Sequence, residues 1–174
     1  MTQGSEDDFV AFVRARQGAL LRSAYLICGD HHLAQDLLQD ALVKLASRWE
    51  RLRDERPEAY VRRILYRDAI SRWRRLRREH LADHQDPGGL FGSHEAPDGT
   101  ASWLTNDEIR RALVQLPPRQ RAVIVLRYYE DLSEVQIAEA LNIAPGTVKS
   151  QASDALRKLR RLIPAIDETA QELR

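Results

Sequence analysis

The chain has 174 residues, 43% of them hydrophobic and 30% charged, with a net charge of +1 at pH 7 and one cysteine. This length fits one or two small domains, and the single cysteine excludes an internal disulfide framework and fits a reducing cytosol. No apolar run approaches membrane-spanning length and the acidic start Glu6-Asp7-Asp8 is unlike a signal peptide, so we expect a soluble cytoplasmic protein without membrane insertion.

The near-zero net charge conceals two segments of opposite character. Residues 48–80 contain twelve Arg against six acidic residues, whereas residues 83–108 contain six acidic residues and neither Lys nor Arg. Guanidinium groups at such density repel one another unless a polyanion is present. Phosphate binding is therefore the natural explanation for the basic segment.

Apolar residues at helical spacing predict three helices in the first half of the chain, over residues 6–28, 31–49 and 57–81. Gly29 suits the end of the first helix, Asp30 caps the second, and Pro57 suits the first turn of the third. The charged residues 51–56 form the connector between the second and third helices.

Little in the sequence points to catalysis or to a metal site. Cys28 lies near His31 and His32, but adjacent histidines point apart on a helix, so a small buried cysteine is the favoured interpretation. The histidines are otherwise scattered, no carboxylate pair has a meaningful spacing, and no glycine-rich Lys-Ser/Thr phosphate loop is present. We therefore expect no enzyme activity, no catalytic residue and no cofactor.

The second and third predicted helices differ in what surrounds their apolar stripes. The outward side of the second helix is formed by Gln35, Asp36, Gln39, Asp40, Val43 and Lys44. Taken alone, this side fits a solvated surface. The third is surrounded by Arg and also carries Tyr60, Tyr66 and Trp73. Aromatic rings among cations suit unpaired nucleic-acid bases. Core packing is the alternative for each ring, and is favoured for Tyr60 and Trp73.

Glycine, proline and acidic residues without helical spacing predict a flexible acidic linker over residues 84–104. Helices are expected again up to Gln115 and over residues 119–130, and the residues beyond Pro164 are polar and expected to fray. No stretch reads as a strand. The predicted fold class is all-α, with two small helical bundles joined by the flexible acidic linker.

The second bundle contains a predicted helix-turn-helix. Ser133 and Gln136 form a capping box, and Pro145 starts the second helix. The first helix has an apolar stripe of Val135, Ile137, Ala138 and Leu141. The polar face of the second carries Thr147, Lys149, Ser150, Gln151, Ser153, Asp154 and Arg157. A solvated surface has the same pattern, but the tight turn, the small residues at the helix start and the basic run 157–161 favour DNA binding in a major groove.

Three motifs make the chain resemble a known family. They are residues 36–42 (Asp-Leu-Leu-Gln-Asp-Ala-Leu), 116–123 (Leu-Pro-Pro-Arg-Gln-Arg-Ala-Val) and 146–150 (Gly-Thr-Val-Lys-Ser). Because the motifs occur in this order and at this spacing, the chain resembles the extracytoplasmic-function sigma factors, the smallest promoter-recognition subunits of bacterial RNA polymerase. The resemblance covers nearly the whole chain. The resemblance implies sigma region 2 over residues 1–83, sigma region 4 over residues 105–174, and a function in binding rather than catalysis.

The resemblance also implies three contact surfaces. The second helix would dock on the clamp of the polymerase core through Asp36, Leu37, Gln39, Asp40 and Val43. The third helix and its connector would engage the −10 element and capture an unpaired base, with Arg53, Arg56, Arg62, Arg63, Arg67 and Arg74 as contacts. The second bundle would pack on the polymerase flap and read the −35 element through Arg119, Thr147, Lys149, Ser150, Gln151, Ser153, Asp154 and Arg157.

Some positions depart from the family pattern. Arg67 and Ser71 stand where Asn and Asp are frequent, and Ala144 stands where a capping Ser is common, at a typical cost of about 1 kcal/mol. Gln151 and Asp154 replace residues that are usually basic or larger, and they could pair with adenine and cytosine respectively. The promoter sequence is therefore not determined by the resemblance.

Three questions stay open at the level of sequence. The acidic linker either lies against the Arg-rich helix and keeps the free protein off DNA, or it is a solvated tether. A stand-alone helix-turn-helix regulator is the rival function, although such proteins usually dimerise and this chain has no obvious dimerisation heptad. Whether an anti-sigma factor is a further partner is not decided either.

Overall fold

The computed structural model describes residues 3–82 and 107–163, and every element in these ranges is a helix, which confirms the all-α prediction. The first range forms α1 (Gln3–Cys28), α2 (His31–Ala46), α3 (Trp49–Leu52) and α4 (Pro57–Ala82). The second forms α5 (Asp107–Gln115), α6 (Pro118–Ile124), the π-helix η2 (Val125–Tyr129), α7 (Glu134–Leu141) and α8 (Pro145–Leu162). We call α1–α4 the first module and α5–α8 the second module. The predicted linker and C-terminal tail lie outside the described residues.

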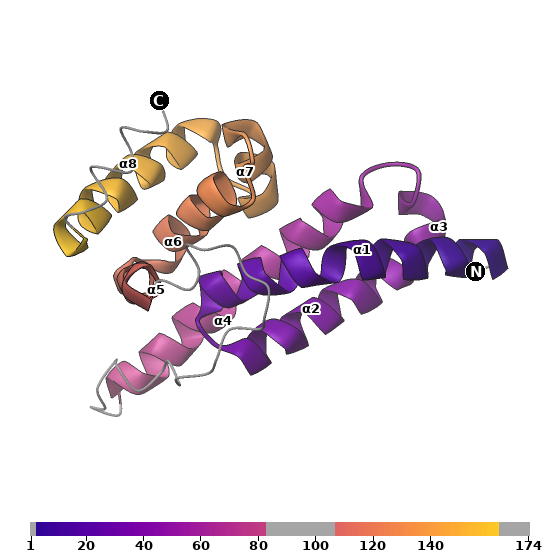
Figure 1. Ribbon diagram of the computed structural model, residues 1–174, viewed down its shortest axis with the longest axis horizontal. Helices are drawn as coiled ribbons and strands as arrows, with labels where there is room; N and C mark the ends of the chain where they lie inside the picture. Colours follow the sequence, from indigo (N-terminus) through magenta and orange to yellow (C-terminus); the bar gives the residue numbers. More distant parts are fainter. Residues whose placement is uncertain (1–2, 83–106, 164–174) are drawn as a thin grey trace.

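The first module is built on three long helices, α1, α2 and α4, which pack against one another (Figure 1). Asp30 caps α2 as predicted, because its side chain accepts a hydrogen bond from the N–H of Leu33 at 2.7 Å. Gly29 ends α1 with a φ of 81°, a left-handed conformation that glycine adopts without steric cost. The core contains side chains at most 1% exposed, among them Leu20, Ala24, Ile27, Leu45, Val61, Leu65 and Ala69.

The prediction of one helix over residues 31–49 is wrong at its C-terminal end. The chain leaves α2 at Ala46 and makes a turn, in which the hydroxyl of Ser47 donates to the carbonyl of Lys44 at 2.9 Å. Trp49 then starts the separate helix α3. Its buried ring packs against those of Phe9 and Phe12, with ring centroids 5.2 and 5.5 Å apart. The short helix α3 places this ring in the core.

The second module contains the predicted helix-turn-helix as α7 and α8. The capping box is confirmed, since the N–H of Ser133 donates to Gln136 Oε1 at 2.9 Å and the N–H of Gln136 donates to Ser133 Oγ at 3.3 Å. The inclusion of Val135 in the buried stripe is wrong, because its side chain is 67% exposed. Val135 lies two residues from the buried Ile137, which is roughly 200° around a helix. Ala140 is buried instead.

The helix predicted over residues 119–130 also differs from the prediction. It begins at Pro118 as α6 and continues as the π-helix η2. At the end of η2, the N–H of Glu130 donates a hydrogen bond to the carbonyl of Val125 at 3.2 Å. A π-turn inserts one extra residue into a helix and therefore changes the direction of the side chains that follow it. This local change sets the direction of the Glu130 side chain, which follows the π-turn directly.

We expect Ala144→Ser to stabilise the protein by about 1 kcal/mol. Ala144 is the N-cap of α8 with extended backbone angles and no side-chain cap hydrogen bond, as the sequence implies. A serine hydroxyl at this position can accept from a free N–H of the first helical turn. Urea unfolding followed by circular dichroism measures the change, with Ala144→Val as a control that adds a side chain without a cap. A midpoint no higher than that of the wild type would contradict the expectation.

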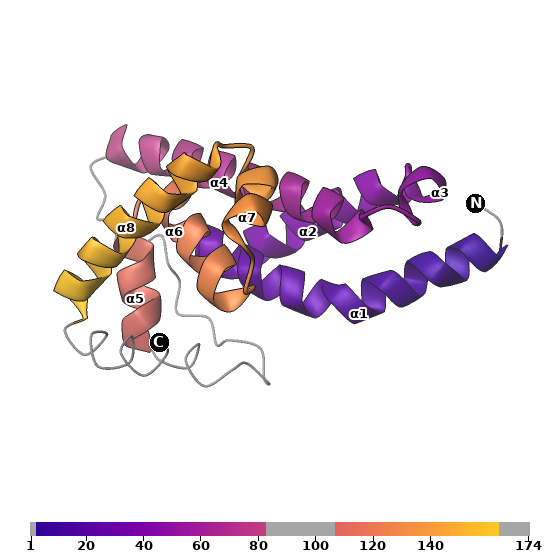
Figure 2. The same ribbon diagram turned by 90° about the horizontal axis from the view of Figure 1, so that it is seen from above.

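The two modules lie against each other, an arrangement that the sequence does not predict. Helices α6 and α7 contact α4, and α6 and η2 contact α1. Figures 1 and 2 both place the second module toward the end of the first that is remote from the N-terminus. We call this contact region the seam.

Candidate nucleic-acid and polymerase interfaces

A basic groove runs along the first module where the end of α2, α3 and the first half of α4 meet. Its cavity has a volume of about 590 Å³ and is lined by Lys44, Arg48, Arg51, Tyr60, Arg63, Ile64, Arg67, Asp68 and Ser71. Five of these residues are cationic and one is acidic. Asp68 pairs with Lys44 over 3.3 Å at one side of the groove. The four arginines of the groove, Arg48, Arg51, Arg63 and Arg67, give it a positive potential suited to phosphate.

Two guanidinium groups lie near the ring of Tyr60 in this groove. The Cζ atoms of Arg48 and Arg63 are each 5.8 Å from the centre of its ring, within the range of cation–π attraction. Arg48 also donates a hydrogen bond to the phenol oxygen. The ring is half-buried, so part of its surface is open to a ligand. A flat ring beside cations can stack a base while its neighbours hold the adjoining phosphates.

The structure places the six arginines predicted to contact the −10 element in different surroundings. Arg63 and Arg67 line the groove. Arg53 pairs with acidic side chains at 3.5 and 3.7 Å, and Arg74 is exposed on α4. Arg56 and Arg62 line a different cavity, at the seam. Only two of the six therefore share the groove with Tyr60.

The aromatic predictions need one correction. Tyr66 was expected to offer an aromatic surface to bases, but its side chain is fully buried. Burial and the nearby Glu130 carboxylate raise the pKa of Tyr66 well above its usual value, so the phenol stays protonated. Tyr60, for which core packing was favoured, is the ring in the groove, and the side chain of Trp73 lies outside the described part. Sequence reasoning also did not single out Arg48 and its contact with Tyr60.

The predicted polymerase surface lies on the outer side of α2. Asp36, Gln39 and Asp40 are exposed there, and Val43 is 63% exposed. Leu37 is 3% exposed and lies in the core rather than on this surface. Beside the exposed residues runs a groove of about 430 Å³, lined by Phe9, Val13, Gln17 and Leu21 of α1 and Gln35, Leu38, Gln39, Leu42, Val43 and Ala46 of α2. An exposed aliphatic side chain beside a largely apolar groove is suited to a protein partner.

The polar face of α8 carries the side chains predicted to read DNA. Lys149, Ser150, Ser153 and Arg157 are exposed, whereas Thr147, Gln151 and Asp154 are half-buried. Their polar groups make weak surface contacts: Arg157 pairs with Asp154 at 3.1 Å, and Lys149 with Glu134 at 3.6 Å. Such exposed pairs contribute little to stability and can exchange for phosphate. Arg119 is exposed on α6.

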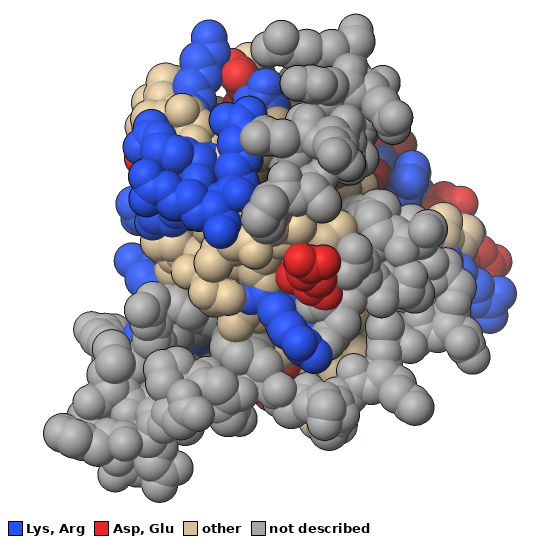
Figure 3. Space-filling model, turned by 60° about the vertical axis from the view of Figure 1, so that its left-hand side comes forward, with Lys and Arg blue, Asp and Glu red and all other residues tan. Residues whose placement is uncertain are grey.

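The C-terminal half of α8 extends this face with positive charge. Arg157, Lys158, Arg160 and Arg161 are all exposed. Figure 3 shows a large gathering of Lys and Arg side chains on the side of the molecule where this part of α8 lies. The second module thus has a cationic surface of its own, distinct from the groove on the first module.

The described residues include neither a metal site nor a membrane-spanning helix. No group of three or more His, Cys, Asp and Glu side chains in residues 3–82 and 107–163 could hold a metal ion. Within the same ranges, no helix has both the length and the apolar character needed to cross a bilayer. Cys28 is buried, which raises its thiol pKa to about 11, so the cysteine is structural as expected.

Comparison with known proteins places these surfaces in a family. Residues 12–79 match the family described as Sigma-70 region 2, and residues 106–159 match Sigma-70, region 4. The "RNA polymerase sigma-E factor" of Streptomyces avermitilis is 37% identical, with the alignment covering 99% of this chain and 94% of that protein. The chain belongs to the extracytoplasmic-function sigma factors of RNA polymerase. The resemblance stated from the three motifs is thereby confirmed.

Further relatives of this sigma factor extend the comparison. The "RNA polymerase sigma-E factor" of Streptomyces coelicolor is 38% identical over 95% of this chain and 92% of that one. The "ECF RNA polymerase sigma factor SigW" of Bacillus subtilis is 29% identical over 91% and 92%. Among solved structures, the sigma factor RpoE from Bartonella quintana, in complex with the anti-sigma factor NepR, matches with a TM-score of 0.66 and 27% identity, covering 89% of this chain and 96% of that one. This sigma factor is thus a promoter-recognition subunit and a transcription initiation factor.

Proposed function

We propose that this sigma factor opens promoters by capturing an unpaired −10 base against Tyr60 in the basic groove of the first module. The observation that carries the proposal is the position of the Tyr60 ring in the basic groove, close to Arg48 and Arg63. Bases of duplex DNA are stacked on each other and cannot reach this ring, whereas an extruded base can. The groove therefore binds the melted strand more tightly than the duplex, and this difference drives opening.

The other two surfaces have separate roles in the proposal. The exposed side of α2, with Asp36, Gln39, Asp40 and Val43, docks on the polymerase clamp. The polar face of α8 reads the −35 element in the major groove, and its basic C-terminal half contacts phosphates. RNA polymerase and the chromosome are both cytoplasmic, and so is the site of action. The protein contributes binding energy and supplies no catalytic group to RNA synthesis.

A pair of variants tests the separation between the two DNA surfaces. We expect Tyr60→Ala to lower the affinity of the assembled holoenzyme for a single-stranded −10 oligonucleotide about tenfold, within the range of one lost stacking contact. Arg157→Ala should instead weaken binding of the holoenzyme to a duplex that carries only the −35 element. Fluorescence anisotropy with labelled DNA measures both affinities.

The control for the first variant is Tyr60→Phe, which keeps the ring and removes only its hydroxyl. It should retain most of the affinity for the single strand, because stacking uses the ring. Equal losses in Tyr60→Ala and Tyr60→Phe would indicate that the hydroxyl, and not the ring, makes the contact. Normal binding by Tyr60→Ala would reject the proposed base site.

A further inference from the structure

The seam between the two modules contains a buried carboxylate. Glu130 follows η2 directly, and its side chain is 4% exposed. The phenol of Tyr66 donates to its Oε1 at 2.9 Å, and the hydroxyl of Ser23 donates to the same oxygen. Arg62 donates to Oε2 from Nε at 3.1 Å and from Nη2 at 2.6 Å. All of these donors belong to the first module, so a side chain of the second module fills a socket made by the first.

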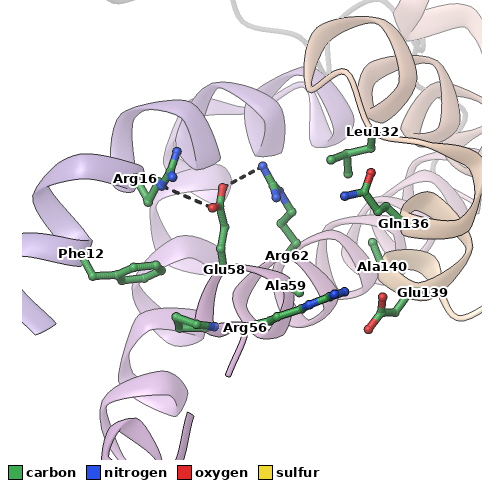
Figure 4. A pocket seen from close by; sticks show the side chains of 11 residues that line it. Phe12, Arg16, Arg56, Glu58, Ala59, Arg62, Leu132, Gln136, Glu139 and Ala140 are labelled. Carbon is green, nitrogen blue, oxygen red and sulfur yellow. Dashed lines mark ion pairs between the residues drawn. The ribbon is translucent and has the colours of Figure 1, made fainter. Parts of the chain in front are cut away.

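The socket is organised independently of the second module. Nη2 of Arg62 also lies 2.8 Å from Glu58 Oε1, one helical turn earlier on α4. Glu58 in turn pairs with Arg16 of α1 at 3.3 Å, and Figure 4 shows this chain of side chains converging at the seam. These contacts lie entirely within the first module. They would keep Arg62 oriented toward the socket after the second module has moved away.

The seam combines buried apolar side chains, which join the cores of the two modules, with polar contacts beside a cavity. A cavity of about 440 Å³ lies beside the socket, lined by residues of α1, α4 and α7. Nearby, Arg22 Nε donates to the phenol oxygen of Tyr129 at 2.7 Å, and Arg121 Nη1 donates to the carbonyl of Ile27 at 3.0 Å. Water can replace such contacts when the modules separate, as at a transient interface between domains. The buried charge of Glu130 then regains its hydration.

We propose that Glu130 is an intramolecular latch, which enters the socket of Ser23, Arg62 and Tyr66 and holds the two modules of the free protein closed. In the closed protein Arg62 is occupied by Glu130, and α8 is fixed relative to α4 through α7. Polymerase and promoter must displace this contact before the two DNA surfaces can be spaced along a promoter. The latch is a property of the free chain, and only its role in delaying promoter engagement rests on the proposed function.

The distance between the modules of the free, full-length protein tests the latch. Fluorescent labels placed at Ser47→Cys on the first module and Ser153→Cys on the second, in a Cys28→Ala background, report this distance by single-molecule energy transfer. Glu130→Gln keeps the size of the side chain, but removes its charge and replaces one of its two acceptor oxygens by an N–H donor in a socket made of donors. We expect this variant to raise the population of separated molecules at least fivefold. Tyr66→Phe removes one donor and should shift the distances in the same direction by a smaller factor.

The matched control is Glu139→Gln, because Glu139 is an exposed carboxylate that lines the same seam cavity. It should leave the distances unchanged, and circular dichroism verifies the helix content of each variant. The latch is overturned if Tyr66→Phe and Glu130→Gln keep the wild-type distances, or if Glu139→Gln separates the modules equally well. Should Glu130→Gln fail to fold, the comparison of Tyr66→Phe with Glu139→Gln decides. Core-polymerase binding by unlabelled wild type is measured separately, and its failure would reject the proposed function without touching the latch.

Discussion

Arg121→Ala is expected to lower the free energy of unfolding by about 3 kcal/mol or more, the largest stability effect of any single substitution considered. Arg121 is 0% exposed, although it is a charged side chain on the second module. Its guanidinium donates to the carbonyl oxygens of Ile27 at 3.0 Å, Val114 at 2.7 Å and Leu116 at 3.3 Å. Truncation leaves a cavity and removes the donor from three carbonyl groups, one of them across the seam. Urea unfolding followed by circular dichroism measures the loss.

The neighbouring Arg119 provides the matched control for this substitution. It has the same side chain two residues earlier on α6 but is exposed, so Arg119→Ala should change stability by less than about 0.5 kcal/mol. Arg121→Met separates the two causes, because it refills much of the volume without restoring a donor. We expect it to recover only part of the loss. Equal stability of the Arg121→Ala and Arg119→Ala proteins would show that the buried guanidinium is not needed to hold α6 in place.

Val43→Asp is expected to weaken binding to core polymerase at least tenfold while leaving the fold intact. Val43 is 63% exposed beside the groove between α1 and α2. In the unbound protein the new carboxylate is therefore in contact with solvent and does not disturb the fold. In the proposed complex the new carboxylate would be desolvated at an apolar contact without a partner, which costs several kcal/mol at an interface centre. Fluorescence anisotropy of the labelled protein, titrated with core polymerase, measures the affinity.

Val10→Asp is the control for an added acid on the first module. Val10 is 39% exposed on α1 and does not line the groove, so this variant should bind core polymerase normally. Asp40→Ala tests the polar part of the same α2 surface and should also weaken polymerase binding. If Val43→Asp and Val10→Asp bind equally well, polymerase does not dock on this side of α2.

Features determined by neighbouring residues could be predicted from the sequence. The Asp30 cap and the Ser133–Gln136 capping box depend on side chains within three residues of the backbone groups that they bind, and both are present. The missing cap at Ala144 follows in the same way. The helix-turn-helix also follows, since its turn and apolar spacing are local. The family resemblance depended on motifs of this kind.

Features that depend on tertiary contacts could not be predicted. Helical spacing favoured core packing for Tyr60 and not for Tyr66, the reverse of what the structure shows. Tyr66 is buried and bonds Glu130 of the second module, whereas Arg48 of the preceding turn reaches Tyr60 in the groove. The ion pair between Arg62 and Glu130 joins residues 68 positions apart, and no local pattern indicates it. The position of Glu130, an acid at the end of the predicted helix over 119–130, does not by itself indicate a partner on α4.

In vitro transcription with purified core polymerase and a pool of genomic promoter fragments shows whether this protein directs initiation at promoters. We expect transcripts only when both the core enzyme and this protein are present, starting downstream of shared −35 and −10 sequences. The Tyr60→Ala protein should yield fewer transcripts from the same starts. Absence of transcripts under conditions in which another sigma factor directs the same core enzyme would show that this protein does not direct initiation.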